Sequence, residues 1–378
     1  MDVEKKKFEI ALALLPGVSN VMVKRLVDKL GSAETVFQLS ANQWVEQFNI
    51  KSKILFEALQ KPRETYLIEA QQEINRAKAL NIDLVFYTDS NYPERLKNIP
   101  DAPALLYYKG VSSLNSHKTI GIVGTRRATE YGAKITQELL EGLLPYKPLI
   151  MSGLAFGIDI MAHKISLKIG LETVGIMANG LETVYPAAHK DTAKQMCERG
   201  GLLSENRFGS IPLKTMFPAR NRIIAGLSDA IIVIEAADKG GALITANMGN
   251  DYNKEVFAVP GGLNQKYSAG CNELIRANKA QIYTSVNDVI EALNWDLKKK
   301  NKLVEPKIDK KEIDLSAFGN DEKQTIETLI KEGELAIDEL AWKTGISHNS
   351  LASILLSLEF EGLVTALPGK RFRFYGTI

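Results

Sequence analysis

The sequence predicts an α/β protein built on an extended Rossmann-like parallel sheet. Three observations support this. Short apolar segments alternate with helix-length segments between residues 83 and 295, and strands joined by helix-length crossovers pair in parallel. Helical spacing without strands precedes this region, and a helix-turn-helix pattern follows it. We expect a helical domain (1–82), the sheet domain (83–295), a linker (296–312) and a winged-helix domain (313–378).

Length and composition are those of a multidomain globular chain. A length of 378 residues exceeds one ordinary core. The net charge of +2 excludes a polybasic coat, so any nucleic-acid site has to be a local patch. Two cysteines, Cys197 and Cys271, exclude a disulfide framework and a zinc knuckle. Neither a signal peptide nor a membrane span is recognisable, so we expect a cytoplasmic protein with no membrane partner.

The N-terminal region has helical spacing of its apolar residues over 8–80. Its segment LLPGVSNVMVKRLVDKLGS predicts a short helix, a Pro16-Gly17 turn and a second helix that ends at Gly31. This pattern resembles a helix-hairpin-helix or SAM-like domain, whose turn can hold a phosphate through backbone N–H groups. An ordinary helix pair in a small bundle has the same pattern, and the missing Gly-x-Gly turn favours that alternative.

Apolar segments predict the strands of the sheet. Two of them, 84–87 and 104–108, precede the first strand–helix–strand unit and would extend the sheet. The others are 119–123, 149–151, 173–177, 201–203, 230–235, 255–259 and 281–283. We expect helices to cover both faces of the parallel sheet.

The C-terminal region begins with the lysine-rich segment DLKKKNKLVEPKIDKKE, which predicts a solvated linker. A helix near 322–331, a turn at Gly345, a second helix and a two-stranded tail then predict a winged helix. The helix over 347–361 contains no lysine or arginine, so it lacks base-reading groups. Only Lys370, Arg371 and Arg373 on the wing could contact phosphate, which disfavours a transcription regulator and leaves a protein-docking or structural role.

Four glycine-containing loops follow predicted strands: GIVGTRRATEYG, SGLAFGIDIMAH, ANGLETVYP and KGGALITAN. The carboxyl ends of parallel strands share one edge of a sheet, where ligands bind. Glycine lets the backbone approach a ligand, helix starts offer N–H donors, and arginine adds positive charge. The loops together predict an oxyanion or phosphate site. Its candidate residues are Gly124, Thr125, Arg126, Ser152, Gly153 and Gly241.

The segment LKTMFPARNR adds a basic turn, Arg220 to Arg222 with Asn221 between them. Lys214 and Phe217 are three residues apart and would share a face if the segment were helical. A cation for phosphate and an aromatic ring for a base are what single-stranded nucleic acid requires. Phe217 could equally be a core aromatic, and both interpretations stay open.

Cofactor and metal motifs are missing. No Gly-Lys-Ser/Thr follows a glycine turn, and GIVGTRRA lacks the third glycine of the dinucleotide fingerprint. Asp159 and His163, four residues apart, predict hydrogen bonding within a helix, because a metal site would need a third ligand. We predict no cofactor and no metal.

These motifs, with TVGIMANGLETVYP, LLSENRFGSIPLKTMFPARNRIIAGLSDAIIVIEAADKGGALITA and VFAVPGGLNQKYSAGCNELI, make residues 84–290 resemble the DNA-processing protein A (DprA, or Smf) family. The resemblance implies a non-enzymatic protein that binds and protects single-stranded DNA and loads the RecA recombinase in natural transformation. It also implies a homodimer through the Rossmann-like domain, with a contact near 271–275. The DNA contacts that it implies are Gly124, Thr125, Arg126, Lys214, Phe217, Arg220, Asn221 and Arg222.

The alternative function is that of a nucleotide phosphoribohydrolase of the LOG type, which shares the Rossmann-like sheet. Those enzymes carry a Pro-Gly-Gly-x-Gly-Thr-x-x-Glu motif whose acid is catalytic. Here the comparable helix start is GGALITA, with Thr245 and Ala246 where an acid would be needed. A general acid or base requires a titratable group within reach. The sequence therefore predicts a binding protein.

Overall fold

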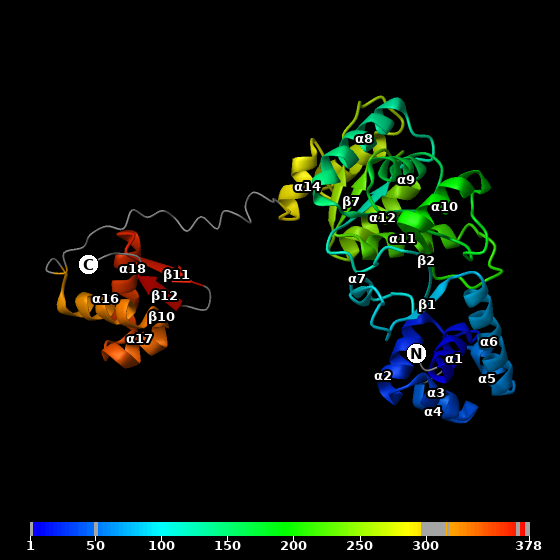
Figure 1. The fold of residues 1–378 in the computed structure, drawn as a ribbon, viewed down its shortest axis with the longest axis horizontal. Helices are drawn as coiled ribbons and strands as arrows, with labels where there is room; N and C mark the ends of the chain where they lie inside the picture. Colours follow the sequence, from blue (N-terminus) through cyan, green and yellow to red (C-terminus); the bar gives the residue numbers. More distant parts are fainter. Residues whose placement is uncertain (1–2, 49–51, 296–314, 316–317, 368–370, 375–378) are drawn as a thin grey trace. The chain divides into compact units, whose positions relative to one another are not determined.

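The computed structural model describes residues 3–48, 52–295, 315, 318–367 and 371–374. The chain divides into two compact units, Met1–Trp295 and Asp296–Ile378 (Figure 1). The predicted linker 296–312 and the wing residue Lys370 lie outside the described residues. Within the described residues, no helix is long and apolar enough to cross a membrane.

The first unit begins with a bundle of short helices. These are α1 (Val3–Leu14), α2 (Asn20–Leu30), α3 (Ala33–Gln38), α4 (Ala41–Phe48), α5 (Lys53–Leu59) and α6 (Arg63–Ala79). Helix α2 starts where the Ser19 side chain accepts a hydrogen bond from Met22 N, and it ends at Gly31, whose φ of 85° is left-handed. The sequence correctly predicted that end.

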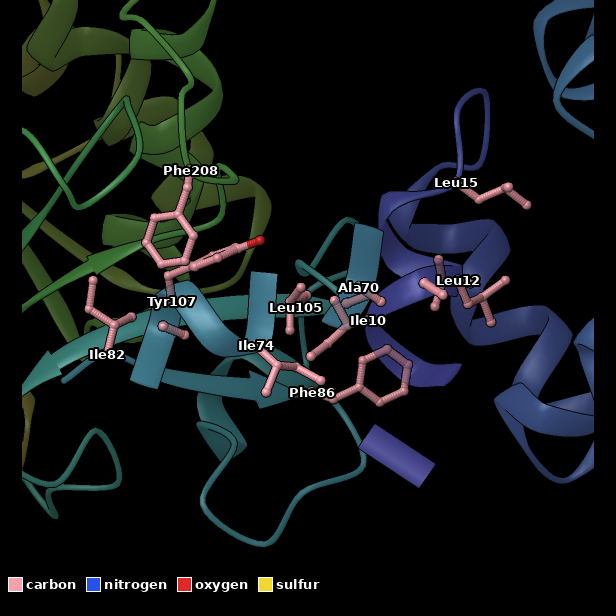
Figure 2. Packing of buried hydrophobic residues seen from close by; sticks show 14 of the residues in the cluster. Ile10, Leu12, Leu15, Ala70, Ile74, Ile82, Phe86, Leu105, Tyr107 and Phe208 are labelled. Carbon is pink, nitrogen blue, oxygen red and sulfur yellow. The ribbon is translucent and has the colours of Figure 1, made fainter. Parts of the chain in front are cut away.

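The helical bundle shares its core with the sheet. Figure 2 shows Ile10 of α1 and Ile74 of α6 beside Phe86, Leu105 and Tyr107 of the first two strands, and all of them belong to one buried apolar cluster. Burial of this apolar surface stabilises the contact between bundle and sheet. The bundle is therefore packed onto the sheet domain.

The sheet has the strand order β1-β2-β6-β5-β4-β3-β7-β8-β9 within the described residues. Each predicted strand is present, with ends that differ by at most two residues. The bounds are β1 (Asp83–Phe86), β2 (Leu105–Gly110), β3 (Thr119–Val123), β4 (Leu149–Ser152), β5 (Thr173–Ile176), β6 (Gly200–Ser204), β7 (Ala230–Val233), β8 (Glu255–Ala258) and β9 (Gln281–Ile282).

The direction of winding reverses at the centre of the sheet. From β3 the chain builds β4, β5 and β6 outward on one side, and then returns to place β7, β8 and β9 on the other. These strands are parallel, whereas β2 runs antiparallel to both β1 and β6. The expectation of a parallel sheet is thus correct for β3 to β9, and the two strands that were expected to extend the sheet do so through antiparallel pairing. The reversal between the neighbouring strands β3 and β7 is a topological switch point, where such sheets bind ligands.

Alternating side chains attach helices to both faces of the sheet. In β7, Ile231 and Val233 pack in one apolar cluster with α11 (Met216–Leu227), α12 (Gly241–Asp251) and α13 (Ala269–Arg276). Ile232 packs on the opposite face with α8 (Glu130–Leu143), α9 (Ile158–Ile169) and α14 (Val286–Ala292). The period of two along a strand produces this division. The remaining helices of the unit are α7 (Glu94–Lys97), η1 (Leu144–Tyr146), η2 (Ala187–His189) and α10 (Lys190–Arg199).

The second unit has the predicted helix-turn-helix and hairpin. Its elements are α16 (Asn320–Glu332), β10 (Glu334–Ala336), α17 (Ile337–Thr344), α18 (His348–Phe360), β11 (Val364–Leu367) and β12 (Arg371–Phe374). Gly345, with φ of 70°, ends α17 and sets the turn. Leu340, Leu351 and Leu355 form part of the core beneath a sheet of order β10-β12-β11.

Candidate functional site

A cavity of about 720 Å³ opens at the switch point. We call it the switch-point cavity. The four glycine-containing loops, which follow β3, β4, β5 and β7, all contribute to its lining, and the segment after β6 adds Pro212 and Lys214. The predicted convergence of the loops on one edge is therefore observed.

The loop after β3 is held rigidly. Thr125 N donates to Glu235 O at 2.7 Å, and Thr125 O accepts from Ile158 N at 3.2 Å. Gly124 packs against Ile158 so closely that a Cβ atom would overlap that side chain. Only glycine fits there, and the tight turn presents Arg126 to the cavity.

Arg220 is the buried cation of the site. Its side chain lines the cavity although the residue is only 4% exposed. NH1 donates to Ile176 O at 2.5 Å, while Nε is buried and has no hydrogen-bond partner in the described part of the chain. Burial lowers the pKa of Arg220 to about 10, and the Asp159 carboxylate opposes that shift. The guanidinium thus keeps its charge at neutral pH.

Neither Ser152 nor Gly153 lines the switch-point cavity. Ser152 is hydrogen-bonded within the sheet, and Gly153 packs against Arg220. Ser152 is fully buried, and its Oγ donates to Ile122 O at 2.6 Å. A Cβ atom at Gly153 would overlap the Arg220 guanidinium. Gly153 lines an adjoining cavity of about 100 Å³ that also reaches Arg126 and Arg220.

Aromatic rings form one wall of the site. The Arg126 guanidinium lies 5.4 Å from the centroid of the Phe217 ring. The centroid of the Tyr185 ring lies 6.0 Å from that of Phe217, and the two rings are tilted against each other. Tyr185 is 49% exposed. Sequence reasoning missed Tyr185, although it stands in one of the four loops. Phe217 is half-buried at the cavity rather than in the core.

The basic segment lies within helix α11, so the prediction of a basic turn is wrong. Lys214 precedes the helix and lines the cavity together with Phe217. Asn221 Nδ2 lies 3.5 Å from Gly241 O and connects α11 to the start of α12. Gly241, the first residue of α12, has open space where a side chain would be. The first N–H groups of α12, which lack partners within the helix, therefore border the cavity.

Arg222 lies elsewhere. It is not among the residues that line the cavity, and it forms ion pairs with Glu205 at 2.5 Å and Asp101 at 3.6 Å. Arg220 and Arg222 are two residues apart on a helix, which directs their side chains to different sides.

The surroundings of two titratable groups, Asp159 and His163, differ from the predicted hydrogen bond within the helix. Asp159 lines the cavity, and burial raises the pKa of its carboxyl. His163 bonds through Nδ1 to Thr173 Oγ1 of β5 at 2.6 Å, so the predicted bond within the helix is wrong. Burial lowers the pKa of His163 to about 3. No group of three or more potential metal ligands occurs among the residues with a described structure.

The wing of the second unit carries cations that are already paired. Arg371 Nε lies 3.0 Å from Glu334 Oε1, and Arg373 NH2 lies 2.7 Å from Glu334 Oε2. The two charges of the wing that the structure describes therefore face one carboxylate.

Family models and a curated relative point to the same family. A model for DNA recombination-mediator protein A matches residues 83–294, and one for the DprA winged helix domain matches residues 315–370. Protein Smf of Synechocystis sp. is 31% identical over 98% of each chain.

Two solved structures are similar as well. DprA of Streptococcus pneumoniae is 31% identical, with a TM-score of 0.56 over 75% of this chain and 95% of its own. DNA processing protein A of Helicobacter pylori, solved to study its single-stranded DNA binding mode, is 30% identical, with a TM-score of 0.52 over 57% of this chain and 96% of its own.

Proposed function

The chain belongs to the DNA recombination-mediator protein A family, and on that premise we propose that it binds single-stranded DNA in the switch-point cavity. By doing so it protects incoming DNA and presents it to the RecA recombinase during natural transformation. The single-stranded DNA binding of the Helicobacter pylori relative supports the choice of ligand.

The observation that carries the proposal is the availability of positive charge in the cavity. Arg126, Lys214 and Arg220 all line it. Arg126 and Lys214 take part in no ion pair among the described residues, whereas Arg220 has the Asp159 carboxylate as an electrostatic partner. A DNA phosphate supplies the missing counter-charge for Arg126 and Lys214. Binding then releases the counterions of the DNA, so affinity depends steeply on salt.

The aromatic wall provides for the bases. Phe217 and Tyr185 offer ring faces beside the cations, and a base that stacks on an aromatic ring gains affinity without sequence preference. The N-terminus of α12 adds N–H donors for a phosphate. Backbone and base contacts within one cavity suit a flexible single strand better than a duplex.

The protein acts as a homodimer through the Rossmann-like domain in this proposal. The expected contact near 271–275 lies on α13, where Cys271 and Leu274 belong to the core. A partner would therefore meet the other side of that helix.

RecA delivery is tested by measuring the rate of RecA assembly on single-stranded DNA with and without the protein.

A hydrolase is the second candidate, because Asp159 brings a carboxyl group to the cavity. Burial raises the pKa of the Asp159 carboxyl, which is the direction that favours a general acid. The hydrolase would release a free base from a nucleoside monophosphate, and Asp159→Asn would abolish that release. Observing both results would contradict a purely DNA-binding role.

The decisive experiment is an anisotropy titration of labelled oligo-dT over a range of salt. Arg126→Glu and Lys214→Glu are each expected to weaken binding and to flatten the salt dependence, by roughly 0.7 in the slope for each phosphate that the protein no longer neutralises. Lys53→Glu is the matched control, since Lys53 is exposed on α5, outside the cavity. Parent-like binding by both cavity variants would refute the site.

A further inference from the structure

Helix α11 has two functional sides. Phe217, Arg220 and Asn221 face the switch-point cavity, as their spacing of three and four residues requires. Arg222 projects from another side and is buried, with its side chain only 10% exposed. The contacts of Arg222 therefore determine what lies behind the cavity wall.

Arg222 is held by carboxylates and linked to the helical bundle. Its NH2 group donates to Glu205 Oε2 at 2.5 Å, and Asn20 Nδ2 donates to the same oxygen at 3.4 Å. Asn20 is the first residue of α2, and its Oδ1 accepts from Ala104 N at 2.9 Å. A chain of polar contacts thus runs from the N-terminal bundle through Glu205 to α11.

The same cluster reaches the second helix of the cavity. Arg222 Nε lies 3.6 Å from Asp101 Oδ2, and the hydroxyl of Tyr252 donates to Asp101 Oδ1 at 2.7 Å. Tyr252 caps the C-terminal end of α12, whose N-terminal end borders the cavity. Both helices that flank the cavity are therefore anchored, away from it, to Arg222 and Asp101.

The existing ion pairs of Arg222 argue against a DNA phosphate as its partner. Glu205 and Asp101 both pair with its guanidinium, and Lys24 also interacts electrostatically with Arg222 and Asp101. Removing one member of a buried ion pair leaves the other uncompensated, which destabilises the local structure. A contribution of Arg222 to binding would then be indirect.

We infer that Arg222 is a positioning residue: with Glu205 and Asn20 it couples the N-terminal helical bundle to α11 and so holds Phe217, Arg220 and Asn221 in place for DNA. This inference rests on the proposed DNA-binding function. It assigns the helical bundle a role in the site without any contact between the bundle and DNA.

The salt dependence of oligo-dT binding separates positioning from contact. Arg222→Gln is expected to weaken binding roughly three- to tenfold with the salt slope of the parent. Arg126→Gln should lower the slope by about 0.7. Arg222→Lys, which keeps the charge, should recover part of the affinity. A slope for Arg222→Gln that falls as far as that of Arg126→Gln would show direct phosphate contact and overturn the inference.

Asn20→Ala tests the coupling from the bundle. It should weaken oligo-dT binding with an unchanged salt slope, and without DNA it should speed amide hydrogen exchange in α11. Asn75→Ala is the matched control, because Asn75 is an exposed residue of α6 whose side chain accepts a hydrogen bond from Gln71 of the same helix. If Asn20→Ala behaves like Asn75→Ala in both measurements, the coupling does not exist.

Failure of the parent to bind oligo-dT would refute the proposed function and this inference with it. Normal binding by the parent, with the same affinity in the Asn20 and Arg222 variants, would refute only the inference.

Discussion

The switch-point cavity and the wing of the second unit both present arginines, but only one of them offers unpaired charge. Arg126 lines the cavity and has no ion-pair partner in the described chain, whereas Arg371 and Arg373 are both paired with Glu334. An exposed ion pair has a small net energy, yet it leaves little net field to attract a phosphate. The surroundings of a cation, and not its presence, therefore decide whether a surface binds nucleic acid.

The switch-point cavity also differs from helix α18 of the second unit in the groups that each presents. The loop after β3 is bonded on both sides, to Glu235 and Ile158, and its glycine leaves no room for a side chain. Helix α18, which occupies the position of a recognition helix, ends in Phe360, an aromatic that is 85% exposed. The cavity therefore has preorganised groups for a charged ligand, and α18 presents an apolar surface instead.

The largest effect is expected from crowding the buried cation of the cavity. Gly153→Ala places a methyl group on the Arg220 guanidinium, which should cost about 1–3 kcal/mol of stability and roughly tenfold or more in oligo-dT affinity. Gly319→Ala is the control, because Gly319 does not line the cavity and its Cβ position has room, with Glu322 Oε2 at 3.6 Å. Anisotropy and thermal unfolding measure both. Equal effects of the two variants would contradict the assigned role of Gly153.

Loss of the aromatic wall should have the next largest effect. Phe217→Ala removes a stacking surface worth about 1–3 kcal/mol per base, so anisotropy should report weaker binding of oligo-dT with an unchanged salt slope. Phe217→Leu restores apolar volume without a ring and should remain weak. Phe360→Ala on α18 should bind like the parent. Recovery by Phe217→Leu would mean that Phe217 only fills space.

Acidification should destabilise the first unit through His163. The pKa of His163 is lowered by burial to about 3, against 6.5 ordinarily, so below pH 6.5 the unfolded chain takes up a proton that the folded chain refuses. The contribution of neutral His163 to the free energy of unfolding is fully present above pH 6.5. Between pH 6.5 and pH 3 it should fall by up to about 1.4 kcal/mol per pH unit. His163→Gln should show a shallower pH dependence in thermal unfolding. His348, the histidine of the second unit, has an exposed side chain and offers no such buried group. An equally steep dependence in His163→Gln would contradict this account.

The smallest effect is expected from the wing. Arg371→Ala combined with Arg373→Ala removes cations that already face Glu334, so oligo-dT affinity should change by no more than about twofold. The titration that measures the cavity variants provides the comparison. A loss of oligo-dT affinity as large as that of Arg126→Glu would mean that the wing contacts DNA. The proposed difference between the cavity and the wing would then be wrong.

The sequence alone determined the elements of the fold, because their patterns are local. The apolar run 119–123 coincides with β3, and the Gly240-Gly241 pair opens α12. The four loops could be assigned to one edge from chain order alone, since strands with helical crossovers pair in parallel. That rule does not apply to β2, because residues 111–118 between β2 and β3 contain no helix, and β2 pairs antiparallel with β6.

Only the tertiary structure decided which side chains reach the cavity. Arg220 and Arg222 have the same chemistry and nearly the same position in sequence, yet one lines the cavity and the other is paired behind it. Ser152 is buried away from the cavity, whereas Asp159 and Tyr185, which the sequence did not assign to the site, line it. The physical reason is that helix phase and long-range packing set the direction of a side chain, and the partners that fix them, such as Glu205 and Asn20, lie far away in the sequence.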